Sequence, residues 1–167
     1  KKEFLEKALE NGNEAIRLTE QFQPFLYWNR GIIQLHLAET KHELVELAAK
    51  LEIKRKLLQE ALSDLKNCLK LLLKGITLYR KSSVMPFTSL GNVQYQYGNW
   101  LGSLYEYTNN RKHLKEAIET FEDAAESFQK TNLKTRVAEC NWKTAHAYDT
   151  LTEYLKAAEN FDRASHN

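Results

Sequence analysis

The sequence predicts an all-α fold in which antiparallel helical hairpins stack as an α-solenoid of six to seven helices. One observation is composition, because only 2 Pro and 6 Gly among 167 residues suit long helices better than a strand-rich fold. A second is apolar periodicity at helical spacing, which continues almost without a break from residue 25 to residue 81. The third is an internal repeat, which occurs as Ala117-x3-Phe121-x2-Ala124 and again as Ala157-x3-Phe161-x2-Ala164.

The repeated pattern carries most of this prediction. Spacings of four and three residues place Ala117, Phe121 and Ala124 on one helical face, where Ala lets a neighbouring helix approach and Phe fills the gap. A Tyr precedes each copy, at Tyr105 and Tyr148, and is assigned to the partner helix of each hairpin. Units that recur because they cannot bury an apolar face alone form stacked repeats, whose usual role is binding.

The size of the chain favours one domain. At 167 residues with 43% hydrophobic residues, the chain is long enough to bury a core of its own. We expect a single helical-repeat domain over 1–167, with a divergent long helical hairpin region at 1–85 and two repeats at 86–167. The sequence starts without Met, which favours a fragment of a larger protein.

The N-terminal half begins with a helix predicted over 2–21, which has a weak point at Asn11-Gly12-Asn13. Pro24 is expected to open the next helix, since its missing N–H costs nothing in a first turn. A heptad of apolar residues then follows, at Leu44, Leu51, Leu58, Leu65, Leu72 and Tyr79.

This apolar seam has two interpretations. It predicts either a coiled coil that pairs with another chain or an antiparallel hairpin that buries the seam internally. The hairpin is favoured, with helices near 25–51 and 55–81 and a turn near Lys54-Arg55-Lys56. The polar stretch 39–43 is the other candidate position for a break between helices. Whether 25–81 forms one long helix or a hairpin is left open by the pattern.

The C-terminal half is divided by clear breaks. After the interruption at 82–86, Pro86 begins a helix that ends at Thr108-Asn109-Asn110, because Asn tolerates the left-handed conformation that ends helices. Further helices are predicted over 111–129 and 133–151, joined at 131–132. Thr152 is expected to cap a last helix over 153–164.

These residues resemble the tetratricopeptide repeat (TPR), whose first helix carries Leu-Gly and Tyr and whose second carries Ala, Phe and Ala. The first copy comprises Leu101, Gly102, Tyr105, Ala117, Phe121 and Ala124; the second comprises Ala145, Tyr148, Ala157, Phe161 and Ala164. The copies depart from the family pattern, because their interval is near forty residues and the expected Trp is Gly98 or Asn141. They look like elongated, divergent TPR-like repeats.

The resemblance implies a function. In this family the first helix of each pair lines a concave groove that binds a protein or peptide, and no cofactor is involved. The positions carried over are Gln96, Asn99, Ser103, Glu106, Glu139, Trp142, His146 and Asp149. Amides, carboxylates and one Trp are side chains that suit peptide binding, although a merely solvated helix exterior has the same composition.

No catalytic or metal-binding pattern is found in the sequence. It lacks a Gly-rich phosphate loop, a Cys-x2-Cys pair and a His-Glu-x2-His motif, and the single Glu39-x2-His42 has no second copy to complete a metal site. We therefore expect a non-catalytic interaction module with no metal and no cofactor.

Charge suggests an alternative function. The net charge of +2 does not indicate nucleic-acid binding, but residues 50–81 carry nine basic residues against three acidic ones. A helical-repeat RNA-binding module would use this face, at Lys54, Arg55, Lys56, Lys66, Lys70 and Lys74. Nucleic acid is the less favoured partner class, and a coiled-coil-like oligomerisation element is a further alternative, so the oligomeric state stays undecided.

The cysteines bear on the compartment. Cys68 and Cys140 both lie in apolar helical patterns, which predicts two buried thiols and no disulfide. No signal peptide or membrane-spanning run is present in the sequence, so a cytoplasmic location without membrane contact is expected.

Overall fold

The computed structural model describes residues 1–22, 27–78 and 85–166, and within these ranges it consists of seven helices and no strand. The all-α prediction of six to seven helices is thereby confirmed. The chain divides into two compact units, residues 1–81 and 82–167. The single-domain organisation expected from the sequence stays a prediction.

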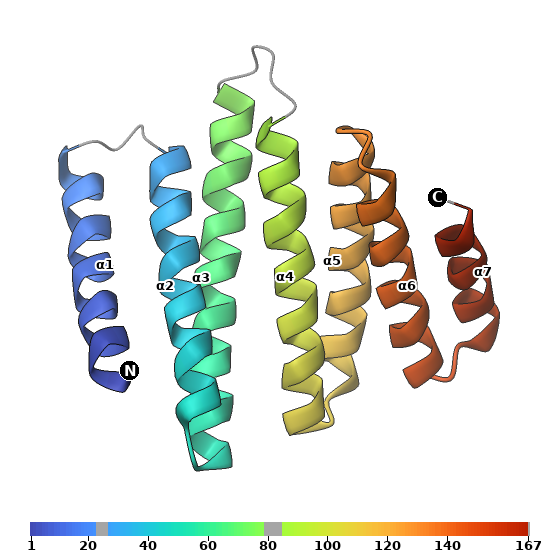
Figure 1. The fold of residues 1–167 in the computed structure, drawn as a ribbon, viewed down its shortest axis with the longest axis horizontal. Helices are drawn as coiled ribbons and strands as arrows, with labels where there is room; N and C mark the ends of the chain where they lie inside the picture. The colour runs from blue at the N-terminus through green and yellow to red at the C-terminus, as the bar shows by residue number, and fades with distance from the viewer. Residues whose placement is uncertain (23–26, 79–84, 167) are drawn as a thin grey trace. The chain divides into compact units, whose positions relative to one another are not determined.

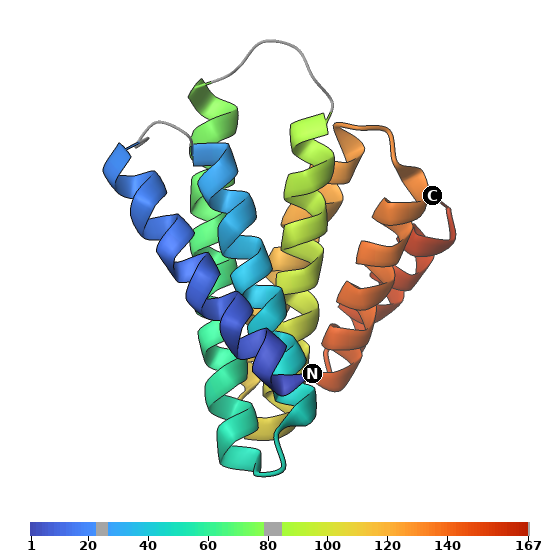
Figure 2. The ribbon, with the colours of Figure 1, turned by 60° about the vertical axis from the view of Figure 1, so that its left-hand side comes forward.

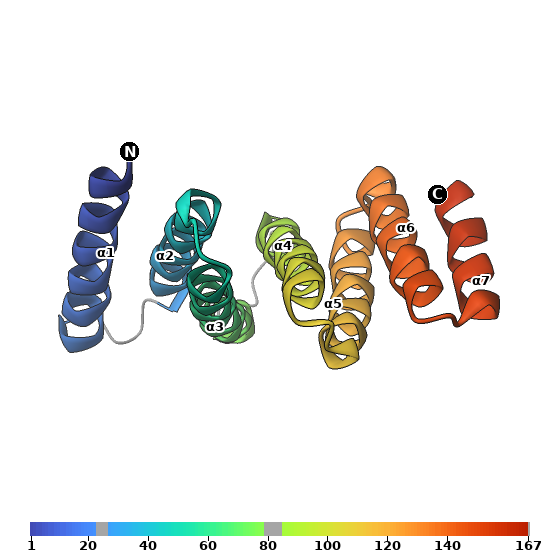
Figure 3. The same cartoon turned by 90° about the horizontal axis from the view of Figure 1, so that it is seen from below.

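In the first unit, α1 spans Lys2–Phe22, α2 spans Tyr27–Leu47 and α3 spans Leu51–Leu78. Helices α2 and α3 lie side by side and antiparallel (Figure 1), and Figure 3 shows their short connecting turn end on. The predicted hairpin is therefore confirmed against one long helix. Pro24 and Tyr79, to which the sequence assigned a helix start and a heptad position, lie outside the described residues.

The position of the hairpin turn differs from the prediction. The turn lies at residues 48–50, with the Ala48 amide donating to the Val45 carbonyl, and not at 54–56. The basic residues 54–56 are helical because Lys and Arg are good helix formers and their charges do not interrupt backbone hydrogen bonding. The second candidate break, 39–43, is also wrong, since these residues lie within α2.

The apolar seam is buried inside this hairpin. Leu58, Leu65 and Leu72 of α3 are each 0% exposed, and Leu44 of α2 is 7% exposed. A seam covered by its own chain leaves no apolar stripe for a second chain, which weakens the coiled-coil interpretation. Leu51 differs because it starts α3, where it is half-exposed.

Helix α1 packs obliquely along α2 (Figure 2) and is continuous through the predicted weak point. A Cβ atom built on Gly12 would lie 2.5 Å from the Leu37 side chain. The glycine that lowers helix propensity is thus the residue that lets the two helices come close.

The second unit contains α4 (Met85–Thr108), α5 (Arg111–Gln129), α6 (Lys134–Thr150) and α7 (Tyr154–Ser165). Pro86 lies in the first turn of α4, and Asn109 and Asn132 have φ angles of 51° and 57°, as expected for residues that end helices. Thr152 also has a positive φ of 63°, so it ends α6, and Glu153 is the N-cap of α7. The prediction that Thr152 caps the last helix is therefore wrong.

Helices of the second unit pack in chain order, with extensive contacts in the pairs α4–α5, α5–α6 and α6–α7. Close approach of α4 and α5 depends on glycine, because a Cβ on Gly98 would lie 2.7 Å from the Phe121 ring and one on Gly91 would lie 2.8 Å from Phe128. Between α5 and α6, Phe128 and Cys140 are both 0% exposed. Stacking of this kind is the packing expected of a helical-repeat solenoid.

Candidate functional site

A pocket of about 520 Å³ lies in the second unit, lined by residues of α4, α5 and α6. We call it the α4–α6 pocket. Four of the eight groove residues expected from the sequence line it, namely Asn99, Ser103, Glu106 and His146. The structure therefore brings polar groups from both first helices of the two repeats to one hollow.

The floor of the pocket was not foreseen. The sequence treated Gly102 as a packed position, but a Cβ built there would have no neighbouring atom within 4 Å. The close contact with α5 lies one turn earlier, at Gly98, against the ring of Phe121. The sequence does carry a signal for this opening, because Gly98 and Gly102 are four residues apart and leave one helical face without side chains.

Trp142 lies beside the pocket and does not line it. Its side chain is 48% exposed, and its ring meets the imidazole of His146 edge to face at 4.2 Å. His146 in turn contacts the ring of Phe161 on α7 at 5.1 Å. These three residues form an exposed row of rings, which we call the aromatic row.

The charges around the pocket are mixed. Glu106 is exposed on α4, while Lys143 of α6 lines the pocket, and its ammonium group lies 5.5 Å from the centre of the Trp142 ring. The Ser103 hydroxyl donates to the backbone carbonyl of Asn99. Because acid, base and amide groups coexist here, this site suits a partner with mixed polarity better than a uniformly acidic segment.

The other groove positions lie outside the pocket. Glu139 pairs with the guanidinium group of Arg136, which stacks on the rings of Tyr95 at 4.5 Å and Phe128 at 4.9 Å. Gln96 is half-buried and Asp149 is exposed, and neither lines the pocket. A helix-phase argument from sequence could not separate these positions from Asn99 and Ser103, since it took Gly102 to be packed against another helix.

The residues of this unit carry few reactive groups. Burial raises the pKa of the Cys140 thiol to about 12, so the thiol is protonated at neutral pH. Burial, followed by the hydrogen bond to Glu116, raises the pKa of Tyr97, whose hydroxyl donates to that carboxylate at 2.7 Å. Cys68 in the first unit is also a buried free thiol, so both cysteines are buried as the sequence predicted.

The part of the chain that the structure describes bears on metal binding and on membrane insertion. No group of three or more His, Cys, Asp or Glu side chains there is placed to hold a metal ion. Within the same residues, no helix combines the length and apolarity needed to cross a bilayer.

The six basic residues singled out in the sequence do not share one site. Lys70 and Lys74 line a pocket in the first unit, whereas Lys54, Arg55, Lys56 and Lys66 do not. Lys56 lies 4.0 Å from Glu60, so part of the basic cluster is balanced locally. This distribution gives little support to a continuous RNA-binding face.

Comparison with known proteins identifies a family. The family model described as SNAP, soluble NSF attachment protein, matches residues 75–167, which is more than half of the chain. Among solved structures, the chain is similar to one titled "DHF58 filament", with a TM-score of 0.51 and 16% sequence identity over 99% of this chain and 80% of that chain. At this identity the likeness shows the fold alone. A comparison with curated proteins found no match.

Proposed function

Because the chain belongs to the soluble NSF attachment protein (SNAP) family, we propose that it is a non-catalytic module that binds a protein partner. The observation that carries the proposal is the α4–α6 pocket with the aromatic row beside it. The family is named for attachment to NSF, so NSF is the first partner to test. The two repeats are proposed to be TPR-like, and a cytoplasmic location belongs to the same proposal, supported by two free buried thiols.

The two parts of the site have different roles in this proposal. An exposed Trp is a common source of binding energy at protein interfaces, because a large rigid ring buries much apolar area at little entropic cost. Trp142, steadied by His146, is the proposed anchor. The amide of Asn99 in the pocket would fix the register of a bound segment through hydrogen bonds.

The test uses purified NSF and a calorimetric titration with the whole chain. Trp142→Ala and Asn99→Ala are expected to weaken binding at least tenfold with helicity retained. Gly102→Leu places a side chain in the open space of the pocket and is expected to block binding without disturbing packing. Tyr154→Ala is the matched control, because Tyr154 is an exposed aromatic residue, 65% accessible, that does not line the pocket.

The possible results distinguish an error in the proposed binding site from an error in the proposed partner. If NSF binds and none of Trp142→Ala, Asn99→Ala and Gly102→Leu weakens its binding, the site is wrong. If NSF does not bind the unmodified chain, the partner is wrong. Equal weakening by Tyr154→Ala would mean that the losses are not specific to the α4–α6 pocket and the aromatic row.

A further inference from the structure

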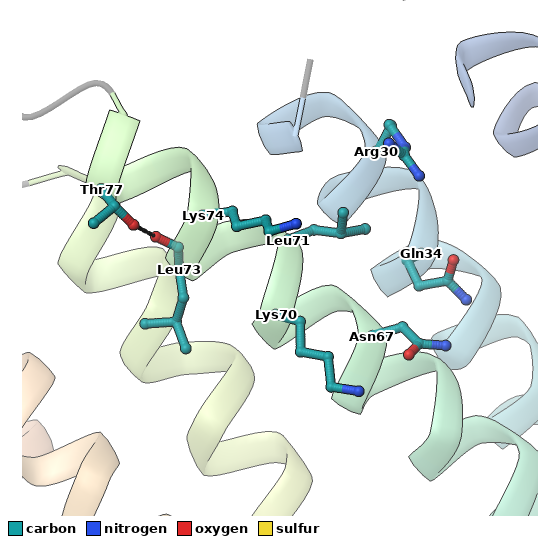
Figure 4. Close-up of a pocket in the computed structure, with 8 residues that line it drawn as sticks. All are labelled: Arg30, Gln34, Asn67, Lys70, Leu71, Leu73, Lys74 and Thr77. Atoms are coloured by element: carbon teal, nitrogen blue, oxygen red, sulfur yellow. Dashed lines mark hydrogen bonds between the residues drawn. The ribbon is translucent and has the colours of Figure 1, made fainter. Parts of the chain in front are cut away.

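A second pocket, of about 690 Å³, lies in the first unit along the α2–α3 hairpin. Helix α2 contributes Arg30 and Gln34, and α3 contributes Asn67, Lys70 and Lys74. In Figure 4 the polar ends of Asn67 and Lys74 extend from α3 towards the side on which α2 carries Gln34. We call this hollow the α2–α3 pocket.

The lining of the α2–α3 pocket is strongly positive. Three of its eight residues are cationic and none is acidic. The Asp64 carboxylate accepts a hydrogen bond from the Gln34 amide at 2.7 Å and pairs with the Lys41 ammonium at 2.6 Å. Because Lys41 neutralises Asp64, this carboxylate offsets little of the charge of Lys70 and Lys74.

The two lysines have no ion-pair partner in the described ranges 1–22, 27–78 and 85–166. The structure gives Lys70 no carboxylate within ion-pair distance, and the recorded contact of Lys74 is with the Tyr27 ring, at 5.2 Å from its centre. Lys70 and Lys74 lie about one helical turn apart on α3, so both side chains project from the same side of the helix. An anion bound in the pocket would be attracted by both lysines at once.

We propose that the α2–α3 pocket binds the phosphate groups of a small phosphorylated molecule. Its volume is within the usual range of small-molecule sites, roughly 300–1,000 Å³. Its polar ends are mainly hydrogen-bond donors: a guanidinium group, two ammonium groups and the Asn67 amide. Oxygen-rich anions match such a donor set, with the Arg30 fork suited to bidentate contacts and the lysines acting as point charges.

A small ligand fits this site better than an RNA backbone does. An extended nucleic acid requires cations along a track and aromatic rings for stacking. The eight described residues that line this pocket include three cations and no aromatic ring, and the neighbouring Tyr27 ring is occupied by the Lys74 ammonium. The other basic cluster of α3 is remote, because Lys56 precedes Lys70 by fourteen residues, roughly 21 Å along a helix.

The experiment is isothermal titration of the whole chain with inorganic tripolyphosphate at low salt and at physiological salt. We expect one site per chain, with binding weakened at least tenfold in the double variant Lys70→Gln/Lys74→Gln. Lys56→Gln is the control, because it removes a lysine charge, one fewer than the double variant, from the same helix at a distance beyond the Debye length, about 8–10 Å. All three side chains are exposed, so folding is expected to be unchanged, as checked by circular dichroism.

Several results would overturn the proposal. Absence of binding at low salt would do so, and so would an equal loss in Lys56→Gln, which would indicate diffuse attraction. A parallel titration with a single-stranded oligoribonucleotide tests the alternative that these residues bind nucleic acid. Tighter binding of that probe, with comparable sensitivity to Lys56→Gln and to the double variant, would assign the basic residues to a nucleic-acid surface instead.

Discussion

The two copies of the repeated motif differ in how their central Phe is packed. Phe121 of the first copy is 4% exposed and lies against Gly98 and the ring of Tyr95, 5.7 Å away between centres. Phe161 of the second copy is 37% exposed and contacts the imidazole of His146. Identical local patterns thus reach different degrees of burial, because α5 packs extensively against two helices and α7 packs extensively against α6 alone.

The largest expected effect comes from truncating the two rings. Phe121→Ala is expected to lower the free energy of unfolding by about 3–5 kcal/mol, since it removes a ring that is 4% exposed and packed against Gly98 of α4. Phe161→Ala should cost only about 1–2 kcal/mol, because a half-open ring buries less area and leaves no closed cavity. Urea denaturation followed by circular dichroism measures both, and equal losses would contradict the contrast drawn here.

The next effect tests why the first copy packs so closely. Gly98→Ala places a methyl group 2.7 Å from the Phe121 ring, and the resulting overpacking is expected to cost about 1–3 kcal/mol. Asn141→Ala, at the matching position of the second copy, should change stability by less than about 0.5 kcal/mol. Combining Gly98→Ala with Phe121→Leu should cost less than the sum of the single changes, and strict additivity would refute the proposed clash.

The pH dependence of stability tests the packing between the two copies of the repeat. The pKa of the buried Cys140 thiol is raised from 9.0 to about 12, so the folded state holds its proton where the unfolded state loses it. Stability is therefore unaffected below pH 9 and falls above it, by about 1.4 kcal/mol per pH unit until the folded pKa is reached. Burial raises the pKa of the Cys68 thiol in the same way, so the test compares Cys68→Ala with the double variant Cys68→Ala/Cys140→Ala. The double variant should lose less stability than Cys68→Ala between pH 8 and pH 10.

The smallest expected effect is a gain. Gly102→Ala adds a methyl group that meets no atom within 4 Å, so removal of a helical glycine should stabilise the protein by about 0.5–1 kcal/mol. Calorimetric melting measures the shift, with Gly98→Ala as the opposite case. A loss of stability in Gly102→Ala would mean that the α4–α6 pocket is narrower than described.

Local chemistry made most of the fold predictable. The α5 bounds agree with the sequence prediction, because Asn110 caps the helix by accepting from the Lys112 amide, and Asn109 ends the preceding one with a positive φ. The α2–α3 turn was misplaced because the sequence around Ala48 carries no Gly or Pro, whereas the charges at 54–56 looked like a break. Turns without such residues are set by tertiary packing.

The candidate site was only partly predictable. Asn99 and His146 line the pocket, but Trp142 lies beside it and Glu139 is held by Arg136. The difference arises from Gly102, since sequence cannot show whether a small residue marks close packing or an opening. The α2–α3 pocket depends on residues of two helices brought together by the hairpin, a juxtaposition that no linear motif records.

Packing in chain order has a consequence for motion. Detaching α7 breaks its extensive interface with α6 and leaves the α4–α5 and α5–α6 interfaces intact, so its amides should exchange with deuterium sooner than those of α5. Leu155 of α7 is 85% exposed. Among the described helices of the second unit, α7 is thus expected to detach before α5, and a partner that contacts α6 and α7 together would slow that exchange.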